Sequence, residues 1–78
     1  MAKVILYGAP WCQWCLRAKM FFENHNIPFE WKDVDIEENA EEVLRKSKQY
    51  SIPVIEIDGQ IIVGFDVERV KSLLKIKE

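Results

Sequence analysis

Residues 4–22 read VILYGAPWCQWCLRAKMFF and carry the only two cysteines of the chain, Cys12 and Cys15. The apolar run at residues 4–7 predicts a buried strand. After the cysteines, apolar residues recur at helical spacing and predict a helix: Leu16, Ala18, Met20, Phe21 and Phe22. The pair is therefore expected where a strand turns into the N-terminus of a helix.

This placement favours sulfur chemistry. The first turn of a helix offers unpaired backbone N–H groups and the positive end of the helix dipole, and both stabilise an anion. Thiolate is such an anion, and it is the form of cysteine that attacks a disulfide. Cys12, at or beside the helix cap, is predicted to be the more exposed and more readily ionised sulfur, with Cys15 more buried behind it. We therefore expect thiol–disulfide exchange, in which Cys12 attacks a substrate disulfide and Cys15 resolves the mixed disulfide.

Size and composition narrow the class of protein. Seventy-eight residues, 49% of them apolar, predict a single domain over residues 1–78. The first apolar run has about four residues, too short for a signal peptide, and no segment approaches the roughly 18 apolar residues of a membrane span. A reducing cytoplasmic location is expected for an isolated CxxC pair. The net charge of −2 gives no basic face for nucleic acid, and a monomer is expected.

The middle of the chain predicts a strand and a second helix. Asn24-His25-Asn26 predicts the end of the first helix, since Asn tolerates the left-handed conformation of a C-cap. Residues 29–34 begin with the alternation of a strand. Asp35, followed three residues later by Glu38, is a capping-box variant that opens a helix. Its predicted apolar stripe is Ala40, Val43 and Leu44, and its early glutamates and late basic residues predict solvation and dipole matching only.

The last third of the chain predicts a hairpin and a third helix. Asp58-Gly59 joins the apolar runs 53–57 and 60–63, and such a two-residue link predicts a tight turn with positive φ. Apolar residues at helical spacing follow at Val67, Val70, Leu73 and Leu74. The order is βαβαββα, with parallel strands in the first βαβ unit. The predicted fold class is therefore α/β: a four-stranded mixed sheet flanked by three helices on both faces.

Other residues near the cysteines have two interpretations each. Lys19 lies on the helix face of the cysteines, where its charge either helps the thiolates or is merely solvated. Pro53 either punctuates a turn or forms a cis peptide that turns the Ile52 backbone toward a docked substrate. Phe65 either joins a docking surface, with Gly64 permitting close backbone approach, or plugs the core.

Two further sets of side chains bear on partners and metals. Trp11 and Trp14 bracket Cys12 and cannot both point inward, so they predict a protein-docking patch. A structural zinc site needs about four ligands, whereas this chain has two cysteines and one histidine. No metal site is therefore expected, and His25 is interpreted as a surface cap residue.

Taken together, these features resemble the thioredoxin superfamily, and within it the small glutaredoxin branch, over essentially the whole chain. The matching stretches are Tyr7-Gly8-Ala9-Pro10-Trp11-Cys12-Gln13-Trp14-Cys15-Leu16-Arg17-Ala18-Lys19, Val34-Asp35-Ile36, Ser51-Ile52-Pro53 and Val63-Gly64-Phe65-Asp66. The resemblance implies a thioredoxin-like (glutaredoxin) fold, a cis Ile52–Pro53 bond and catalytic roles for Cys12 and Cys15.

The resemblance is incomplete where glutaredoxins hold glutathione. Most dithiol glutaredoxins have proline after the first cysteine, where this chain has Gln13. A basic residue that helps hold glutathione is replaced by the apolar stretch 9–11, and of the residues that grip the γ-glutamyl end only Asp66 could partly substitute. The chain also resembles the NrdH-type redoxins, which take electrons from thioredoxin reductase.

The implied function is a glutaredoxin-like electron donor that reduces protein disulfides through a redox-active Cys12–Cys15 disulfide and no other cofactor. Glutathione and thioredoxin reductase are the two electron sources, and ribonucleotide reductase or a peroxide-reducing enzyme is an implied acceptor. The alternatives are an inter-chain iron–sulfur cluster held by Cys12 of each chain and a non-catalytic docking module. The predicted docking residues are Trp11, Gln13, Trp14, Lys19, Ile52, Pro53, Gly64, Phe65 and Asp66.

Overall fold

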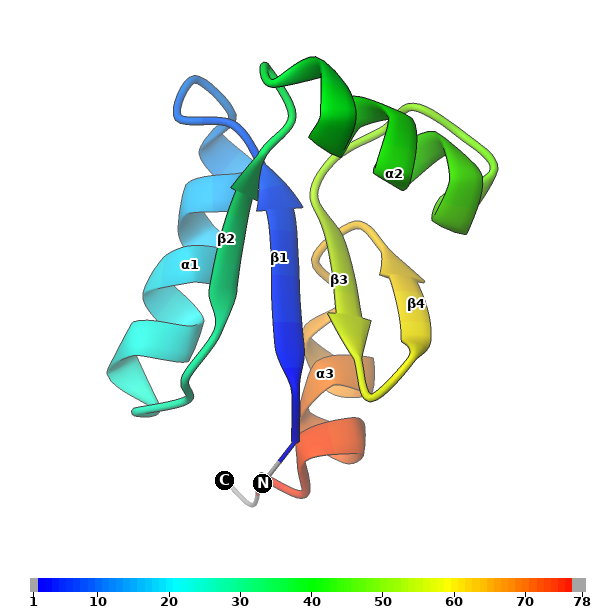
Figure 1. Cartoon of the computed structure of the whole chain (residues 1–78). Helices are drawn as coiled ribbons and strands as arrows, with labels where there is room; N and C mark the ends of the chain where they lie inside the picture. The colour runs from blue at the N-terminus through cyan, green and yellow to red at the C-terminus, as the bar shows by residue number, and fades with distance from the viewer. Residues whose placement is uncertain (1, 77–78) are drawn as a thin grey trace.

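The computed structural model describes residues 2–76, so residues 1, 77 and 78 of the predicted domain lie outside the described part. The elements follow in the predicted order: β1 (Val4–Gly8), α1 (Gln13–Asn24), β2 (Glu30–Asp33), α2 (Glu37–Ser47), β3 (Val54–Ile57), β4 (Gln60–Val63) and α3 (Val67–Leu74) (Figure 1). None of the helices within residues 2–76 combines the length and the apolar character needed to cross a membrane.

The four strands form one mixed sheet in the order β2-β1-β3-β4. β1 pairs parallel with β2 and antiparallel with β3, and β3 pairs antiparallel with β4. The turn between β3 and β4 has φ values of 48° at Asp58 and 86° at Gly59, which confirms the predicted hairpin. The α/β fold predicted from the sequence is therefore correct.

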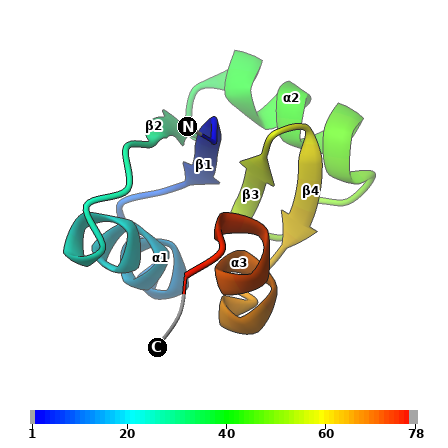
Figure 2. The same cartoon turned by 90° about the horizontal axis from the view of Figure 1, so that it is seen from below.

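The helices cover both faces of the sheet, with α1 and α3 on one side and α2 on the other (Figure 2). Because side chains of a strand alternate between faces, β1 contributes to both cores. Its Leu6 packs in the larger core with Phe22 of α1 and Val70 of α3. Its Tyr7 packs in the smaller core with Val43 of α2. β1 thus lies inside the sheet, between β2 and β3, and has a core on each face.

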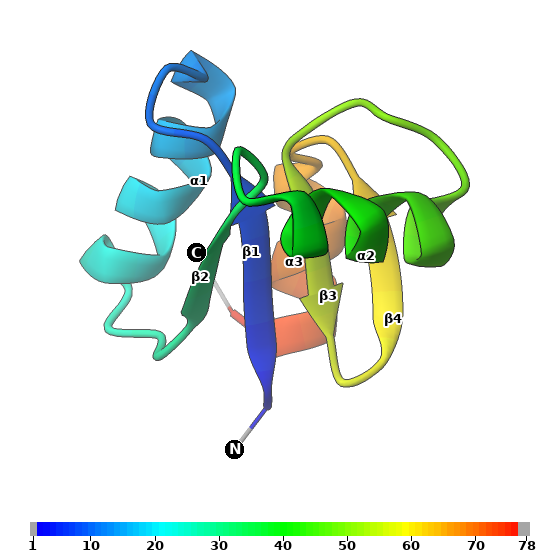
Figure 3. The ribbon, with the colours of Figure 1, turned by 45° about the horizontal axis from the view of Figure 1, so that its top comes forward.

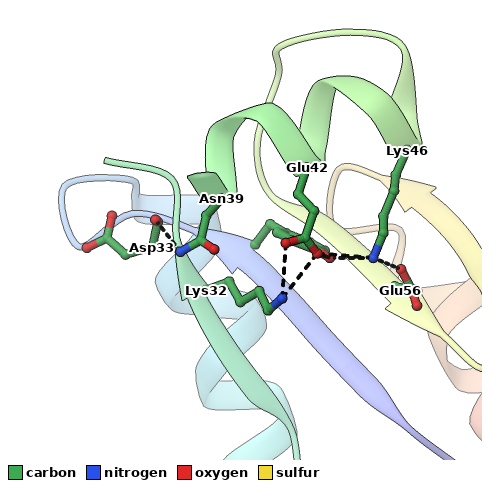
Figure 4. Close-up of polar contacts among 7 residues, drawn as sticks. Lys32, Asp33, Asn39, Glu42, Lys46 and Glu56 are labelled. Atoms are coloured by element: carbon green, nitrogen blue, oxygen red, sulfur yellow. Dashed lines mark hydrogen bonds and ion pairs between the residues drawn. The ribbon is translucent and has the colours of Figure 1, made fainter. Parts of the chain in front are cut away.

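Asp35 does not cap α2, contrary to the capping-box prediction. The N-cap is Ile36, which makes no side-chain cap hydrogen bond, and Asp35 Oδ2 instead accepts the indole N–H of Trp11 at 2.9 Å. Asp33 holds the turn before the helix: its Oδ1 accepts the N–H of Asp35 at 2.8 Å, and its carbonyl accepts Nδ2 of Asn39 at 2.9 Å (Figure 4). A one-residue shift of the helix start therefore frees Asp35 for another partner.

The charge pattern of α2 is also more than solvation, which corrects a second prediction. Glu42 accepts hydrogen bonds from the Tyr7 hydroxyl at 2.7 Å and from Nζ of Lys32 at 3.1 Å. Lys46 donates to the Tyr7 oxygen and to Glu56 Oε1, both at 2.7 Å (Figure 4). We call these five residues the α2 network, and it ties α2 to β1, β2 and β3. The predicted apolar stripe holds at buried Val43, whereas Leu44 is exposed.

Glu42 and Lys46 of the α2 network keep their charges at neutral pH. The pKa of Glu42 is lowered to about 2, chiefly by the hydrogen bond from Tyr7; burial opposes this shift, and the bonds from Lys32 and Lys46 contribute to it. Burial lowers the pKa of Lys46, but its bonds to Glu56, Tyr7 and Glu42 outweigh burial and raise the pKa above its ordinary value. Among residues 2–76 no buried side-chain nitrogen or oxygen lacks a hydrogen-bond partner.

Candidate active site

Cys12 is the N-cap of α1. Figure 3 shows the turn that leads from the end of β1 to the start of this helix. Its backbone is extended, with φ −96° and ψ 111°, and its N–H donates to the carbonyl of Ala9 at 3.0 Å. Its Sγ accepts the backbone N–H of Cys15 at 3.3 Å. The sulfur therefore takes the place of the side-chain oxygen that usually caps a helix, and an N–H donor faces it, as an anion there requires.

Cys15 is fully buried, whereas Cys12 is half-buried. This confirms the predicted difference in exposure between the two sulfurs. The pKa of the Cys15 thiol is raised to about 12, chiefly by burial and in addition by the hydrogen bond with Cys12 and the electrostatic effect of that sulfur. Cys15 is thus held as a protonated thiol directly behind a more accessible sulfur, and both cysteines are unpaired in this structure.

Gly8 is a site residue that the sequence reasoning missed. It ends β1, and a Cβ at this position would lie 2.8 Å from Cβ and 2.9 Å from Sγ of Cys15, and 3.1 Å from the Trp31 ring. Only a residue without a side chain lets β1 pass this close to Cys15. The sequence signal that could have identified Gly8 is its position between the apolar run at residues 4–7 and the CxxC pair.

Trp11 and Trp14 are both exposed, at 68% and 58%. The indole of Trp11 is held by Asp35, and the guanidinium of Arg17 lies over the Trp14 ring at 4.7 Å from its centroid. The predicted exposure is confirmed, and docking through these rings stays a prediction. The role of Asp35 in holding Trp11 could not be found from the sequence, because the two are 24 residues apart.

The Ile52–Pro53 peptide bond is cis, as the resemblance implied. Pro53 is buried, and its carbonyl accepts the N–H of Gly64 at 2.8 Å, which joins the loop before β3 to the end of β4. Ile52 is half-buried and lines a cavity together with Trp11. The structure therefore brings the proline segment and the segment before Cys12 to one place.

The Gly64-Phe65-Asp66 segment links β4 to α3 and contributes a left-handed backbone position, a packed ring and a helix cap. Gly64 has φ +84°, and a Cβ there would meet nothing within 4 Å, so its left-handed backbone rather than close approach explains the glycine. Phe65 packs edge-on against Phe21 with 5.6 Å between ring centroids, which favours the core-plug interpretation. Asp66 caps α3, with its Oδ1 accepting the N–H of Arg69 at 3.2 Å.

The remaining candidates on α1 lie as follows. Gln13 is the first residue of the helix and is exposed. The ammonium group of Lys19 lies over Trp31, 5.4 Å from the ring centroid. His25 is the C-cap, with its ring tilted against that of Phe21 at 4.2 Å between centroids, so it is a cap residue as predicted. In the described part of the chain, no three His, Cys, Asp or Glu side chains come together as metal ligands do.

Comparison with known proteins agrees with this geometry. The glutaredoxin family model matches residues 4–62. An uncharacterised glutaredoxin-like 8.6 kDa protein of a rubredoxin operon in Clostridium pasteurianum is 38% identical over 73 residues, covering 90% of this chain and 95% of that protein. Glutaredoxin 3 of Escherichia coli K12 is 35% identical over 69 residues, covering 85% of this chain and 81% of the relative.

Comparison with solved structures also supports a thioredoxin-like fold. The thioredoxin-like protein BC3987, in a variant form, superposes with a TM-score of 0.90 at 32% identity, covering 99% of this chain and all of that one. The fold and the CxxC site therefore define a thioredoxin-superfamily redox protein. The chain belongs to the glutaredoxin family.

Proposed function

We propose that this protein is a dithiol–disulfide oxidoreductase that reduces protein disulfides, with Cys12 as nucleophile and Cys15 as resolving thiol. The observation that carries the proposal is that the two sulfurs differ in burial and in their surroundings. Cys12 is the half-buried helix cap that faces the N–H of Cys15. Cys15 is buried, with its pKa raised to about 12.

The proposed reaction transfers two electrons in two exchange steps. The Cys12 thiolate attacks one sulfur of the substrate disulfide, forms a mixed disulfide and expels the other substrate sulfur as thiolate. Cys15 then loses its proton to water and attacks Sγ of Cys12, which releases the second substrate thiolate and leaves a Cys12–Cys15 disulfide; the two substrate thiolates take up protons from water. The substrate is reduced to a dithiol, and the protein is oxidised.

The order of the steps follows from the surroundings of Cys15. Burial is the first cause of its raised pKa, and the hydrogen bond and charge of Cys12 add to it. Once Cys12 is bonded to substrate it carries no charge, so part of the cause of the raised pKa of Cys15 disappears. Cys15 should therefore lose its proton more readily after the first step than before it.

Single-cysteine variants test these roles. Cys12→Ser should abolish reduction of a protein disulfide, because no accessible nucleophile remains. Cys15→Ser should accumulate a covalent complex with the substrate through Cys12, seen by non-reducing mass spectrometry. A Cys12→Ser variant that reduces the substrate as wild type does, or a Cys15→Ser variant that traps nothing and turns over normally, would overturn the assignment.

Thioredoxin reductase is a second candidate electron source beside glutathione. Family membership supports glutathione. Against it, residues 8–16 contain no charged side chain, and Asp66 is engaged as a helix cap. A side-by-side assay decides: the oxidised protein receives NADPH with thioredoxin reductase in one arm, and NADPH, glutathione and glutathione reductase in the other. Turnover in only one arm identifies the reductant.

A further inference from the structure

Trp31 of β2 lies on the face of the sheet that α1 covers. β1 and β2 are parallel neighbours in which Leu6 is opposite Trp31, so the side chains of these two residues project from the same face. That face carries the larger core, against which the half-buried ring of Trp31 packs. The helix that holds Cys15 lies on this face too (Figure 2).

The ring edge of Trp31 and the sulfur of Cys15 meet over Gly8. A Cβ at Gly8 would lie 2.9 Å from Sγ of Cys15 and 3.1 Å from Cη2 of Trp31. These two atoms are therefore no more than about 6 Å apart, and they share the space that a side chain at residue 8 would need. Cys15, which has none of its surface exposed, is thus bordered by the backbone of β1 and by an indole from β2.

Lys19 ties this ring to α1. Its ammonium group lies over the Trp31 ring, 5.4 Å from the centroid, and such a cation is attracted by the electron-rich face of an indole. Lys19 lies four residues after Cys15 on α1, and side chains at this spacing are neighbours on a helix. The helix that carries the sulfur therefore also supplies the cation that holds the ring, a use of Lys19 that the sequence did not predict.

We propose that Trp31 is a positioning residue for the resolving step and that Lys19 keeps its ring in place. The indole closes the β2 side of Cys15, so the sulfur has no space there into which to turn away from Cys12. On another side Sγ of Cys12 accepts the N–H of Cys15 at 3.3 Å. The inference rests on the proposed function and names the groups that direct Cys15 to the mixed disulfide. Such orientation of reacting groups can supply a large part of a rate.

One equivalent of dithionitrobenzoate, a small symmetric disulfide whose thiolate product is coloured, separates the two exchange steps of the reduced protein. The Cys12 thiolate attacks it, forms a mixed disulfide and releases one coloured thiolate. The Cys15 thiolate then attacks Sγ of Cys12, releases the second coloured thiolate and leaves the Cys12–Cys15 disulfide. Stopped-flow absorbance records both phases. In Trp31→Leu the first phase should stay within about twofold of wild type, whereas the second, unimolecular phase should slow at least about tenfold.

Phe29→Leu is the matched control for loss of an aromatic ring. Phe29 is half-buried, packs against the same larger core and lies 5.5 Å from Phe22 between ring centroids. It comes two residues before Trp31, further from the end of β2 that pairs with Gly8. Phe29→Leu should therefore lower the free energy of unfolding but leave both phases within about twofold of wild type. Trp31→Phe, which keeps an aromatic ring, should recover part of the second phase.

Two substitutions of Lys19 test its contact with the ring. Lys19→Met keeps an unbranched apolar stem and removes the cation, so the second phase should slow by about two- to fivefold. Lys19→Arg keeps a cation that can lie over an indole, and it should restore the second phase. Equal second phases in the two variants would contradict the role of Lys19.

Alkylation of Cys15 provides a readout that does not depend on exchange with a disulfide. In a Cys12→Ser background, Trp31→Leu should raise the rate at which iodoacetamide modifies Cys15 by at least about tenfold, because the indole no longer covers the sulfur. Phe29→Leu in the same background should leave this rate nearly unchanged. Urea unfolding of both variants shows whether local opening or global unfolding exposes the thiol.

The positioning role is wrong if the second phase of Trp31→Leu keeps its wild-type rate, or if Phe29→Leu slows that phase as much. If Trp31→Leu does not fold, the milder Trp31→Phe and Lys19→Met variants decide by the same comparison. The proposed oxidoreductase function itself fails if wild type releases no coloured thiolate, or if Cys12→Ser releases it as fast as wild type does. Two phases in wild type with an unchanged second phase in the Trp31 variants contradict the positioning role alone.

Discussion

The redox site and the α2 network lie next to each other along β1, and they are built in opposite ways. The network surrounds Tyr7 with two carboxylates and two ammonium groups, and every member has a polar partner. One residue further on, the chain runs from Gly8 to Leu16 without a charge. The polar groups of the α2 network bond to one another and hold α2 on the sheet. The redox site instead leaves the sulfur of Cys12 partly exposed to a substrate.

This difference predicts that the two regions can be damaged separately. Glu42→Ala should produce the largest loss of stability, about 3 kcal/mol, because it removes the acceptor of Tyr7, Lys32 and Lys46 at a half-buried position. The rate of disulfide reduction at 25 °C should stay within about threefold of wild type. Urea unfolding and a disulfide-reduction assay measure the two quantities.

Glu41→Ala is the matched control, since Glu41 is the exposed neighbour of Glu42 on the same helix. It should change the free energy of unfolding by less than about 0.5 kcal/mol. Equal losses for the two alanine variants would mean that the α2 network contributes nothing beyond a surface carboxylate.

Gly8→Ala acts at the junction and should damage both regions. The new Cβ would lie within 3 Å of Cys15, so we expect a loss of about 2 kcal/mol by overpacking together with slower resolution by Cys15. Gly59→Ala serves as comparison, because its Cβ meets open space and its cost comes only from a φ of +86°. Redox turnover should fall in the first variant only; an undisturbed Gly8→Ala protein would contradict the close packing of β1 on Cys15.

Acid should weaken the α2 network. The folded state lowers the pKa of Glu42 to about 2, below its value in the unfolded chain, so its stabilisation is complete above about pH 5 and is lost as the pH falls toward 2. The stability difference between wild type and Glu42→Gln should therefore shrink by roughly 2 kcal/mol between neutral pH and about pH 2. A difference that stays constant in urea unfolding across this range would refute the assignment.

Trp14→Ala should have the smallest effect on stability, below about 0.5 kcal/mol, because the ring is exposed and its partner is a surface arginine. The rate with a protein substrate should fall while the rate with a small symmetric disulfide stays unchanged. A loss of more than about 1 kcal/mol in thermal or urea unfolding would instead give Trp14 a structural role.

The sequence predicted the elements and the two cysteines well because their signals are local. A strand, a cap and a helix can be recognised from spacing within a few residues, and the exposure of Cys12 against Cys15 follows from one helical turn. The same holds for the Asp58-Gly59 turn, where both positions need positive φ. The cis proline needed more than local sequence, which favoured a plain turn at Pro53; the resemblance to glutaredoxins implied the cis bond.

The α2 network and the Trp11–Asp35 bond could not be predicted, because their partners are distant in the chain. Tyr7 is 35 residues from Glu42 and 39 from Lys46. A pattern of early acids and late bases looks the same whether the side chains are solvated or fold back on the sheet. The sequence around Asp35 also matches a helix N-cap, but α2 begins at Glu37 and its N-cap is Ile36.

The most direct test of the central claim is to alkylate the reduced protein with limiting iodoacetamide at about pH 7 and to map the modified cysteine by mass spectrometry. Because Cys12 is accessible and Cys15 is buried as a thiol, the label should appear on Cys12 with at least about tenfold preference. Equal labelling, or labelling of Cys15 first, would contradict the division of roles between the two sulfurs.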